Sequence, residues 1–155
     1  MCGIVGGVTE RNIVPILIEG LHRLEYRGYD SAGIAYRTDE KVSLVKSLGR
    51  VHDLEKKLDK KATSNIGIAH TRWATHGIPS EKNAHPHASN KNIYVAHNGI
   101  IENHEDLKSE LKSEGFKLYS QTDSEVIGHL IEFYKQRGMD FDSSVMKAIS
   151  RLKGA

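Results

Sequence analysis

The stretch MCGIVGG (residues 1–7) places the only cysteine of this 155-residue chain at position 2, directly behind Met1. A single cysteine in a globular domain is usually a small buried residue without chemistry. If Met1 is removed, however, Cys2 carries both a thiol and a free α-amino group. Their unperturbed pKa values lie close together, at about 8.5 and about 7.7–8.0. One residue would then supply a nucleophile and its base.

Composition excludes several classes of partner. Lys and Arg total 22 against 20 Asp and Glu, and the formal charge of +2 predicts neither a nucleic-acid nor a membrane partner. No apolar run approaches the roughly 18 residues of a membrane helix. The lone cysteine gives no sign of an oxidising compartment. We therefore expect a cytoplasmic protein.

Short strand-like runs alternate with amphipathic helical runs along the chain, which has the length of one domain or of part of one. Helices are predicted within residues 13–28 and 51–61, after capping patterns that begin at Asn103 and Thr122, and within 143–152. Strands are predicted within residues 2–8, 31–38, 41–49, 65–75 and 93–101. Residues 77–92 form a long polar loop, a kind of segment that often carries function.

The segment HTRWATHG (residues 70–77) ends a predicted strand and enters that loop. It can be read as a solvated arginine beside a packing tryptophan. It can equally be read as a binding site, in which Arg72 grips a carboxylate with its planar guanidinium and Trp73 covers a small ligand. Thr75 and His76 lie close by in the same segment.

The pair Asn98-Gly99, flanked by apolar residues, favours on local grounds a type I′ hairpin turn. The functional alternative is an oxyanion hole, with the Asn98 carboxamide and the Gly99 backbone N–H as neutral donors to a developing negative charge. Asp123 is likewise favoured locally at a helix N-terminus. Its alternative role is to bind the ammonium group of an amino acid, with Arg72 on the carboxylate.

No cofactor is predicted. The chain has neither a GxGxxG nor a GxxxxGK[ST] phosphate loop. Its nine histidines, among them His85 and His87, lack the HExxH spacing or the cysteine pairs of a zinc site. We expect loop or structural histidines and no bound metal.

Six segments occur in a fixed order: CGIVGG, RLEYRGYDSAG, GIAHTRWATHG, NAHPH, HNGIIENH and TDSEVI. Over nearly the whole chain they resemble the glutaminase domain of the glucosamine-6-phosphate synthase family, among the class II glutamine amidotransferases. The resemblance implies an α+β fold of the N-terminal-nucleophile hydrolase type. In that fold, mainly antiparallel sheets stack in a four-layer αββα sandwich.

The resemblance also implies a role for each candidate residue. Cys2 would be the nucleophile with its freed α-amino group as base, and Asn98 and Gly99 would be the oxyanion donors. Arg72, helped by Thr75 and His76, would bind the α-carboxylate of glutamine, and Asp123 its α-amino group. Trp73 would belong to a closing loop, and Arg27 would support the nucleophile.

The implied reaction hydrolyses L-glutamine to glutamate and ammonia through a Cys2 thioester. In the full-length enzyme, sugar isomerase domains that bind fructose-6-phosphate would use the ammonia to make glucosamine-6-phosphate. By this resemblance, we expect residues 1–155 to correspond to the N-terminal part of the type 2 amidotransferase domain, without those isomerase domains. We expect a glutaminase domain cut short at its C-terminus, and self-association through the sheet edges this would expose. The alternative is a silent glutamine-binding or assembly fragment, inactive through truncation or through retained Met1.

Overall fold

An antiparallel sheet is the first group of elements in the computed structural model, which describes residues 1–39 and 41–154. Its strands lie in the order β1-β4-β2-β3. Their bounds are Gly3–Val8 (β1), Ser31–Arg37 (β2), Val42–Leu48 (β3) and Ile66–Arg72 (β4). The register pairs Ile4 with His70 and Gly33 with His70, which places β4 between β1 and β2. The strands predicted for these four stretches are confirmed.

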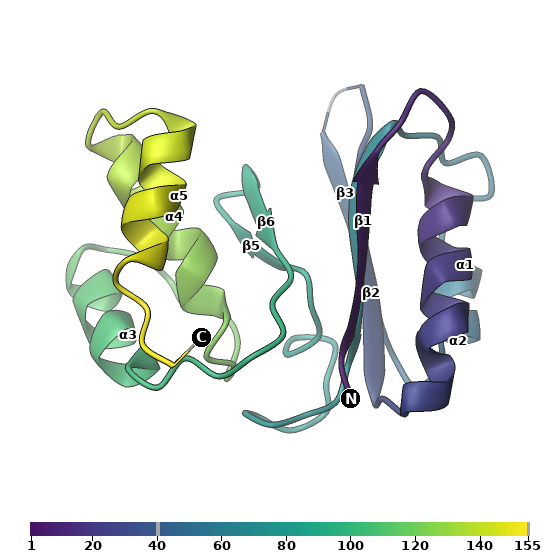
Figure 1. Cartoon of the computed structure of the whole chain (residues 1–155), viewed down its shortest axis with the longest axis horizontal. Coiled ribbons are helices and arrows are strands. Elements are labelled where there is room, and N and C mark those ends of the chain that lie inside the picture. Colours follow the sequence, from purple (N-terminus) through teal and green to yellow (C-terminus); the bar gives the residue numbers. More distant parts are fainter. Residues whose placement is uncertain (40, 155) are drawn as a thin grey trace. The chain divides into compact units, whose positions relative to one another are not determined.

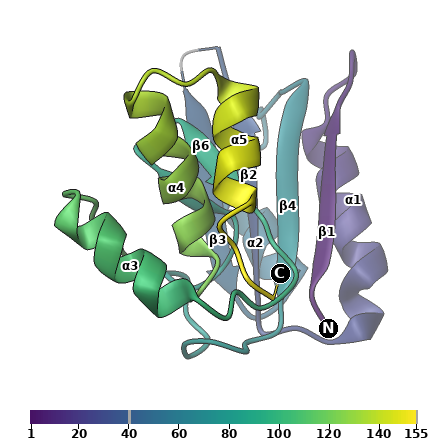
Figure 2. The ribbon, with the colours of Figure 1, turned by 60° about the vertical axis from the view of Figure 1, so that its left-hand side comes forward.

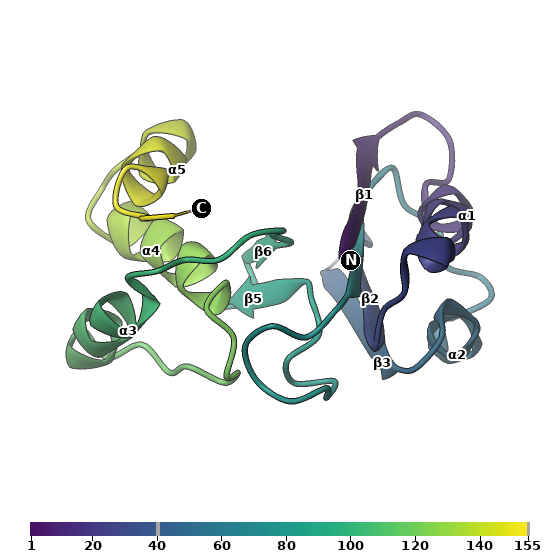
Figure 3. The same ribbon diagram turned by 60° about the horizontal axis from the view of Figure 1, so that its bottom comes forward.

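Helices α1 (Val14–Leu24) and α2 (Val51–Lys57) cover one face of this sheet (Figures 1 and 3). The apolar residues of α1 recur at helical spacing and are buried, Leu17 and Leu21 completely. A short 3₁₀ turn, η1 (Glu25–Arg27), follows α1. Gly28 then turns the chain with a φ of 73°, a left-handed conformation that suits glycine.

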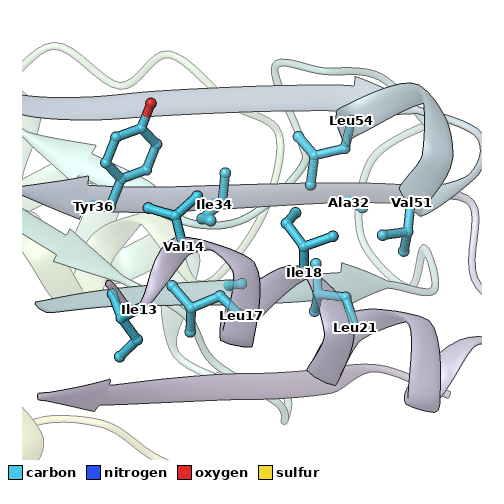
Figure 4. Packing of buried hydrophobic residues seen from close by; sticks show 11 residues of the cluster. Ile13, Val14, Leu17, Ile18, Leu21, Ala32, Ile34, Tyr36, Val51 and Leu54 are labelled. Carbon is cyan, nitrogen blue, oxygen red and sulfur yellow. The ribbon is translucent and has the colours of Figure 1, made fainter. Parts of the chain in front are cut away.

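Because side chains alternate along each strand, the two faces of the sheet have different neighbours. Ala32, Ile34 and Tyr36 of β2 join the core beneath the helices (Figure 4). Ala69 of β4 joins the same core. Successive side chains point to opposite faces of a strand, so His70 lies on the face away from α1 and α2.

The chain divides into two compact units. The first holds the four-stranded sheet and comprises Met1–Pro86 with Ala96–Asn98. The second comprises His87–Val95 with the described residues from Gly99 onward. Each unit has its own apolar core.

The second unit consists of a short hairpin and helices. Its strands are β5 (His87–Ser89) and β6 (Ile93–Val95), and its helices are α3 (His104–Ser113), α4 (Glu125–Gln136) and α5 (Phe141–Ile149). Helix α4 packs against the hairpin and against α3 and α5, and Figure 2 shows α4 beside α5. It is therefore buried on nearly every side, from Glu125 to Tyr134.

Four local expectations are wrong. The loop predicted over residues 77–92 contains β5, and the side chain of Asn103 does not cap α3 but bonds to the backbone of Arg151 and Lys153. The strand predicted to reach residue 101 ends at Val95, and Asn98-Gly99 lies in an irregular segment instead of a hairpin turn. Thr122 does not cap α4, because its hydroxyl bonds with His87 Nε2 at 2.9 Å and Ser124 precedes the helix. At Asn98, Asn103 and Thr122, partners distant in sequence replace the partners that local patterns favour.

Helices and antiparallel strands occur in both units, which confirms the α+β class. Within residues 1–39 and 41–154, no helix has the length and apolar character needed to span a bilayer.

Candidate active site

The Cys2 thiol lies at the start of β1, against the chain that leaves β4. The backbone N–H of Trp73 donates to Cys2 Sγ at 3.2 Å, and the thiol can donate to the Trp73 carbonyl oxygen at 3.6 Å. Cys2 is only partly buried. The sulfur is thus held by backbone groups and stays within reach of a ligand.

The chain terminus is anchored on the turn that follows α1. The Met1 ammonium group donates to the carbonyl oxygens of Arg27 at 2.9 Å and Gly28 at 3.0 Å. The Arg27 guanidinium in turn lies 3.7 Å from Met1 Sδ. Arg27 therefore contacts the N-terminal residue, next in sequence to Cys2.

Arg72 is only 3% exposed, so its interpretation as a solvated arginine is wrong. Its guanidinium donates to the carbonyl oxygens of His76, Gly77 (3.1 Å) and Ile78 (3.4 Å). These bonds fold the loop after β4 back over the end of the strand. Asp30 Oδ1 lies 3.9 Å from Arg72 Nη1 and adds a negative charge beside the guanidinium.

Three further predicted residues belong to this loop. Trp73 is 53% exposed, and its ring lies so close to Gly28 that a Cβ there would be 3.1 Å from it. Thr75 is exposed and His76 is half-buried. The structure therefore places Trp73, Thr75 and His76 on the loop that follows Arg72, the last residue of β4. The Cys2 thiol bonds with the backbone of Trp73, the first residue of that loop.

Asn98 lies beside Cys2, the predicted nucleophile. Its side-chain Nδ2 donates to the Cys2 carbonyl oxygen at 3.3 Å, and its Oδ1 lies 2.9 Å from His70 Nε2. A predicted oxyanion donor and the predicted nucleophile are therefore linked by a hydrogen bond, although they are 96 residues apart in sequence.

The histidines behind Asn98 form a buried stack. The rings of His70 and His85 lie 4.3 Å apart at an angle of 15°. The backbone N–H of His97 donates to His85 Nδ1 at 3.3 Å. Burial lowers the pKa of His70 to about 4, so its ring is neutral at pH 7.

The second unit holds the two other predicted residues. Gly99 is exposed and has a φ of 155°. Asp123 is 3% exposed, and its Oδ2 accepts the backbone N–H of Ile101 at 2.7 Å. Asp123 lies two residues before the start of α4, where the local pattern favours an acidic residue, and its carboxylate also bonds to a backbone group distant in sequence.

The two histidines considered for metal binding have structural contacts in their own units. His85 stacks on His70, and His87 bonds with Thr122. Among residues 1–39 and 41–154, no group of three histidine, cysteine or acidic side chains is arranged to hold a metal ion.

Sequence reasoning missed Asp30 and His70. The Asp30 carboxylate accepts the backbone N–H of Ala74 and thereby fixes the loop that carries Trp73. Both residues lie inside segments that were singled out, YRGYDSAG and HTRWATHG. Asp30 directly precedes β2 and His70 lies in β4, and only the fold shows which side chains they meet.

Known proteins resemble this chain strongly. Residues 70–155 match the family model described as a glutamine amidotransferase domain. Three curated relatives are named glutamine–fructose-6-phosphate aminotransferase [isomerizing]. They come from Pseudomonas putida (54% identical), Clostridium tetani (52%) and Haemophilus influenzae (52%), and each match covers 100% of this chain and 26% of the relative. The chain therefore spans about a quarter of the length of these relatives.

Two solved structures share the fold. One is the glutamine phosphoribosylpyrophosphate amidotransferase of B. subtilis complexed with ADP and GMP, with a TM-score of 0.82 and 29% identity over 100% of this chain and 34% of that one. The other is described as the allosteric regulatory enzyme of purine biosynthesis, with a TM-score of 0.78 and 32% identity over 99% of this chain and 33% of that one. These likenesses confirm the expected N-terminal-nucleophile hydrolase fold. The order of its four layers stays a prediction.

The family model, the curated relatives and the shared fold agree with the resemblance read from the six sequence segments. The chain belongs to the family of glutamine amidotransferase domains.

Proposed function

We propose that this chain hydrolyses L-glutamine to glutamate and ammonia, with Cys2 as the nucleophile. The observation that carries the proposal is the hydrogen bond from Asn98 Nδ2 to the Cys2 carbonyl oxygen at 3.3 Å. It supports a site in which the Cys2 thiol and the Asn98 donor act together on the side-chain carbonyl group of glutamine. The family membership adds support from outside the geometry.

Removal of Met1 precedes the reaction and turns the Cys2 nitrogen from an amide into an amine. That amine takes the thiol proton, and the sulfur attacks the side-chain carbonyl carbon of glutamine. The carbonyl oxygen becomes an oxyanion, and Asn98 Nδ2 and the Gly99 N–H donate to it. The tetrahedral intermediate collapses, the carbon–nitrogen bond breaks, and the α-ammonium group returns its proton to the leaving ammonia. Water then cleaves the thioester and releases glutamate.

Recognition of glutamine falls to the two charged residues. Arg72 binds the α-carboxylate, helped by Thr75 and His76, and Asp123 binds the α-ammonium group. The low exposure of Arg72 and Asp123 supports these roles, because desolvated charges hold an ionic ligand more strongly than solvated ones. Trp73, exposed at the start of the loop, covers the bound substrate, and Arg27 steadies the N-terminal residues.

In the complete protein, the ammonia serves the synthesis of glucosamine-6-phosphate from fructose-6-phosphate in sugar isomerase domains. The names of the curated relatives support this extension. Self-association and a cytoplasmic location remain part of the proposal. Size-exclusion chromatography tests the former, and a single monomeric species would contradict it.

The proposal is tested by measuring glutamate released from L-glutamine. The Cys2→Ala variant should release none, and Asn98→Ala should lower kcat by about 10²- to 10³-fold, the usual effect of losing one oxyanion donor. Asn92→Ala, which alters an exposed asparagine, is the matched control and should keep the original rate. Equal rates in wild type and Cys2→Ala would reject the proposal. A glutamine-binding protein with no turnover, even after removal of Met1, would support the silent-fragment alternative instead.

A further inference from the structure

We propose that His70 is the positioning residue of the oxyanion hole, because it fixes which end of the Asn98 carboxamide faces the reacting carbonyl. This inference rests on the proposed function, in which Asn98 Nδ2 is an oxyanion donor. His70 itself contacts neither the nucleophile nor the substrate in this account.

The contacts of the Asn98 carboxamide define its orientation. A backbone carbonyl oxygen can only accept, so the Cys2 carbonyl, 3.3 Å away, must face the Nδ2 end. The Oδ1 end then faces His70 Nε2 at 2.9 Å. An oxygen cannot donate, so Nε2 must carry the hydrogen of the imidazole ring. His70 is thereby assigned as the donor and Asn98 Oδ1 as the acceptor.

This pairing excludes the flipped carboxamide. A flip would place Oδ1 against the Cys2 carbonyl oxygen, which brings two acceptors together. It would also place Nδ2 against the Nε2–H of His70, which brings two donors together. With His70 in place, one Nδ2 hydrogen binds the Cys2 carbonyl, and the other remains available to an oxyanion.

The surroundings of His70 suit a fixed donor. The residue is completely buried on the face of the sheet away from α1 and α2, so water does not compete for its Nε2–H. The lowered pKa keeps the ring neutral across the physiological range. The ring also stacks on His85, which limits its rotation.

The backbone holds this second ring in place. The His97 N–H bonds His85 Nδ1, and the His85 carbonyl oxygen packs directly against Gly33 of β2, where an added Cβ would lie 2.1 Å from it. The stacked rings of His70 and His85 are therefore held against the sheet, and Asn98 is hydrogen-bonded to the His70 ring. A donor held in this way needs no reorganisation when charge develops on the substrate, which is the condition for effective oxyanion stabilisation.

The test compares two reactions of the Cys2 thiol in the purified protein, after mass spectrometry has shown that Met1 is absent. Glutamine hydrolysis forms an oxyanion. Alkylation by iodoacetamide forms a sulfur–carbon bond as iodide leaves, and it forms no oxyanion. A positioning role predicts that changes at His70 affect the first reaction and not the second.

His70→Phe keeps a flat ring and removes the donor. We expect kcat for glutamine to fall by about 10- to 100-fold, the size expected when one partner of a buried hydrogen bond is lost, with KM and the alkylation rate within about twofold of wild type. His70→Gln places an amide N–H near the position of Nε2 and should restore most of kcat. His52→Phe, in the exposed part of α2 with a 66% exposed side chain, is the matched control and should change nothing.

Further variants separate positioning from folding. In an Asn98→Ala background, His70→Phe should cause no additional loss of kcat, because the group it positions is gone. If His70→Phe fails to fold, His70→Asn and His70→Gln decide the question, because the shorter asparagine cannot reach Asn98 Oδ1 and should be the slower enzyme. Equal kcat in wild type and His70→Phe, equal kcat in the Asn and Gln variants, or parallel loss of hydrolysis and alkylation would overturn the inference. Absence of glutaminase activity in the wild type with Met1 removed would instead reject the proposed function itself.

Discussion

Cys2 can act as its own base only when its nitrogen is an amine. While Met1 is attached, that nitrogen belongs to a peptide bond, and its lone pair is delocalised. In the structure the Met1 ammonium group occupies the carbonyl oxygens of Arg27 and Gly28. The turn after α1 is thus a binding place for a terminal ammonium group. Removal of a single residue decides whether the nucleophile has a base.

Arg72 provides a prediction at the same scale. Arg72→Lys keeps the charge but loses the planar pair of donors, so KM for glutamine should rise by about 10- to 100-fold, corresponding to about 1.5–3 kcal/mol for a charged hydrogen-bonded contact. Steady-state kinetics of glutamate release measures the effect. Arg37→Lys, at an exposed position in β2, serves as the control. An unchanged KM in Arg72→Lys would show that the guanidinium serves only the loop carbonyls.

At the scale of elements, a buried polar network ties α4 to the hairpin and to the segment before the helix. Glu125 accepts the backbone N–H groups of Tyr119 and Ser120, each at 2.7 Å, and lies 3.4 Å from His129 Nε2. His129 Nδ1 pairs with the hydroxyl of Ser89 in β5 at 2.8 Å. Burial alone would raise the pKa of Glu125, but the hydrogen bonds from His129, Ser120 and the backbone outweigh it and lower the pKa.

A lowered folded-state pKa means that the ionised carboxylate stabilises the fold. Glu125→Gln should therefore lower the free energy of unfolding at pH 7 by about 1–3 kcal/mol, since the side-chain nitrogen of glutamine, unlike the carboxylate oxygen it replaces, cannot accept a hydrogen bond from a backbone N–H group. The difference from wild type should shrink as the pH falls from about 4.5 towards about 2, because the carboxylate is protonated first in the unfolded chain and in the folded chain only near its pKa of about 2. Urea denaturation at pH 7 and pH 3 measures it. Glu10→Gln, at an exposed position, should show no such difference.

Alanine substitutions at one glycine in β2 and one in α4 should change the free energy of unfolding in opposite directions. A Cβ at Gly33 would lie 2.1 Å from the His85 carbonyl oxygen, so Gly33→Ala should destabilise the fold by about 1–3 kcal/mol and lower glutaminase activity. A Cβ at Gly128 would meet Ser89 and Val95 at ordinary distances of 3.5 and 3.6 Å. Gly128→Ala should therefore stabilise the fold by about 0.5–1 kcal/mol, because glycine is a poor helix former. Thermal unfolding of both variants checks the pair, and destabilisation by Gly128→Ala would contradict the packing described.

At the scale of the whole molecule, periodicity predicted the strands and helices well, because their apolar residues face cores that the pattern itself defines. Local signals failed at Asn98-Gly99 and at Thr122, where side chains bond to partners far away in sequence. No pattern of single residues indicated that His70 would meet Asn98, since that contact depends on the tertiary fold. Family resemblance supplied the residue roles that periodicity could not.

The two units also differ in how fully local reasoning describes them. In the first unit, alternating apolar residues predict the strands, but the pairing of β1, β2 and β4 is known only from the fold. In the second, α4 is buried on most sides and carries Glu125 and His129 inside the fold. Buried polar residues of this kind are satisfied by specific partners, which composition and spacing do not identify.

The central claim is that Cys2, once Met1 is removed, is the nucleophile of a glutamine site. It is tested most directly by treating the protein with the chloromethyl ketone analogue of L-glutamine and locating the adduct by peptide mass spectrometry. The account predicts one adduct per chain, on a Cys2 that forms the N-terminus, with labelling prevented by excess L-glutamine. Failure to label Cys2 would contradict it. So would labelling of chains that retain Met1, or of chains in excess L-glutamine, at the same rate as unprotected chains without Met1.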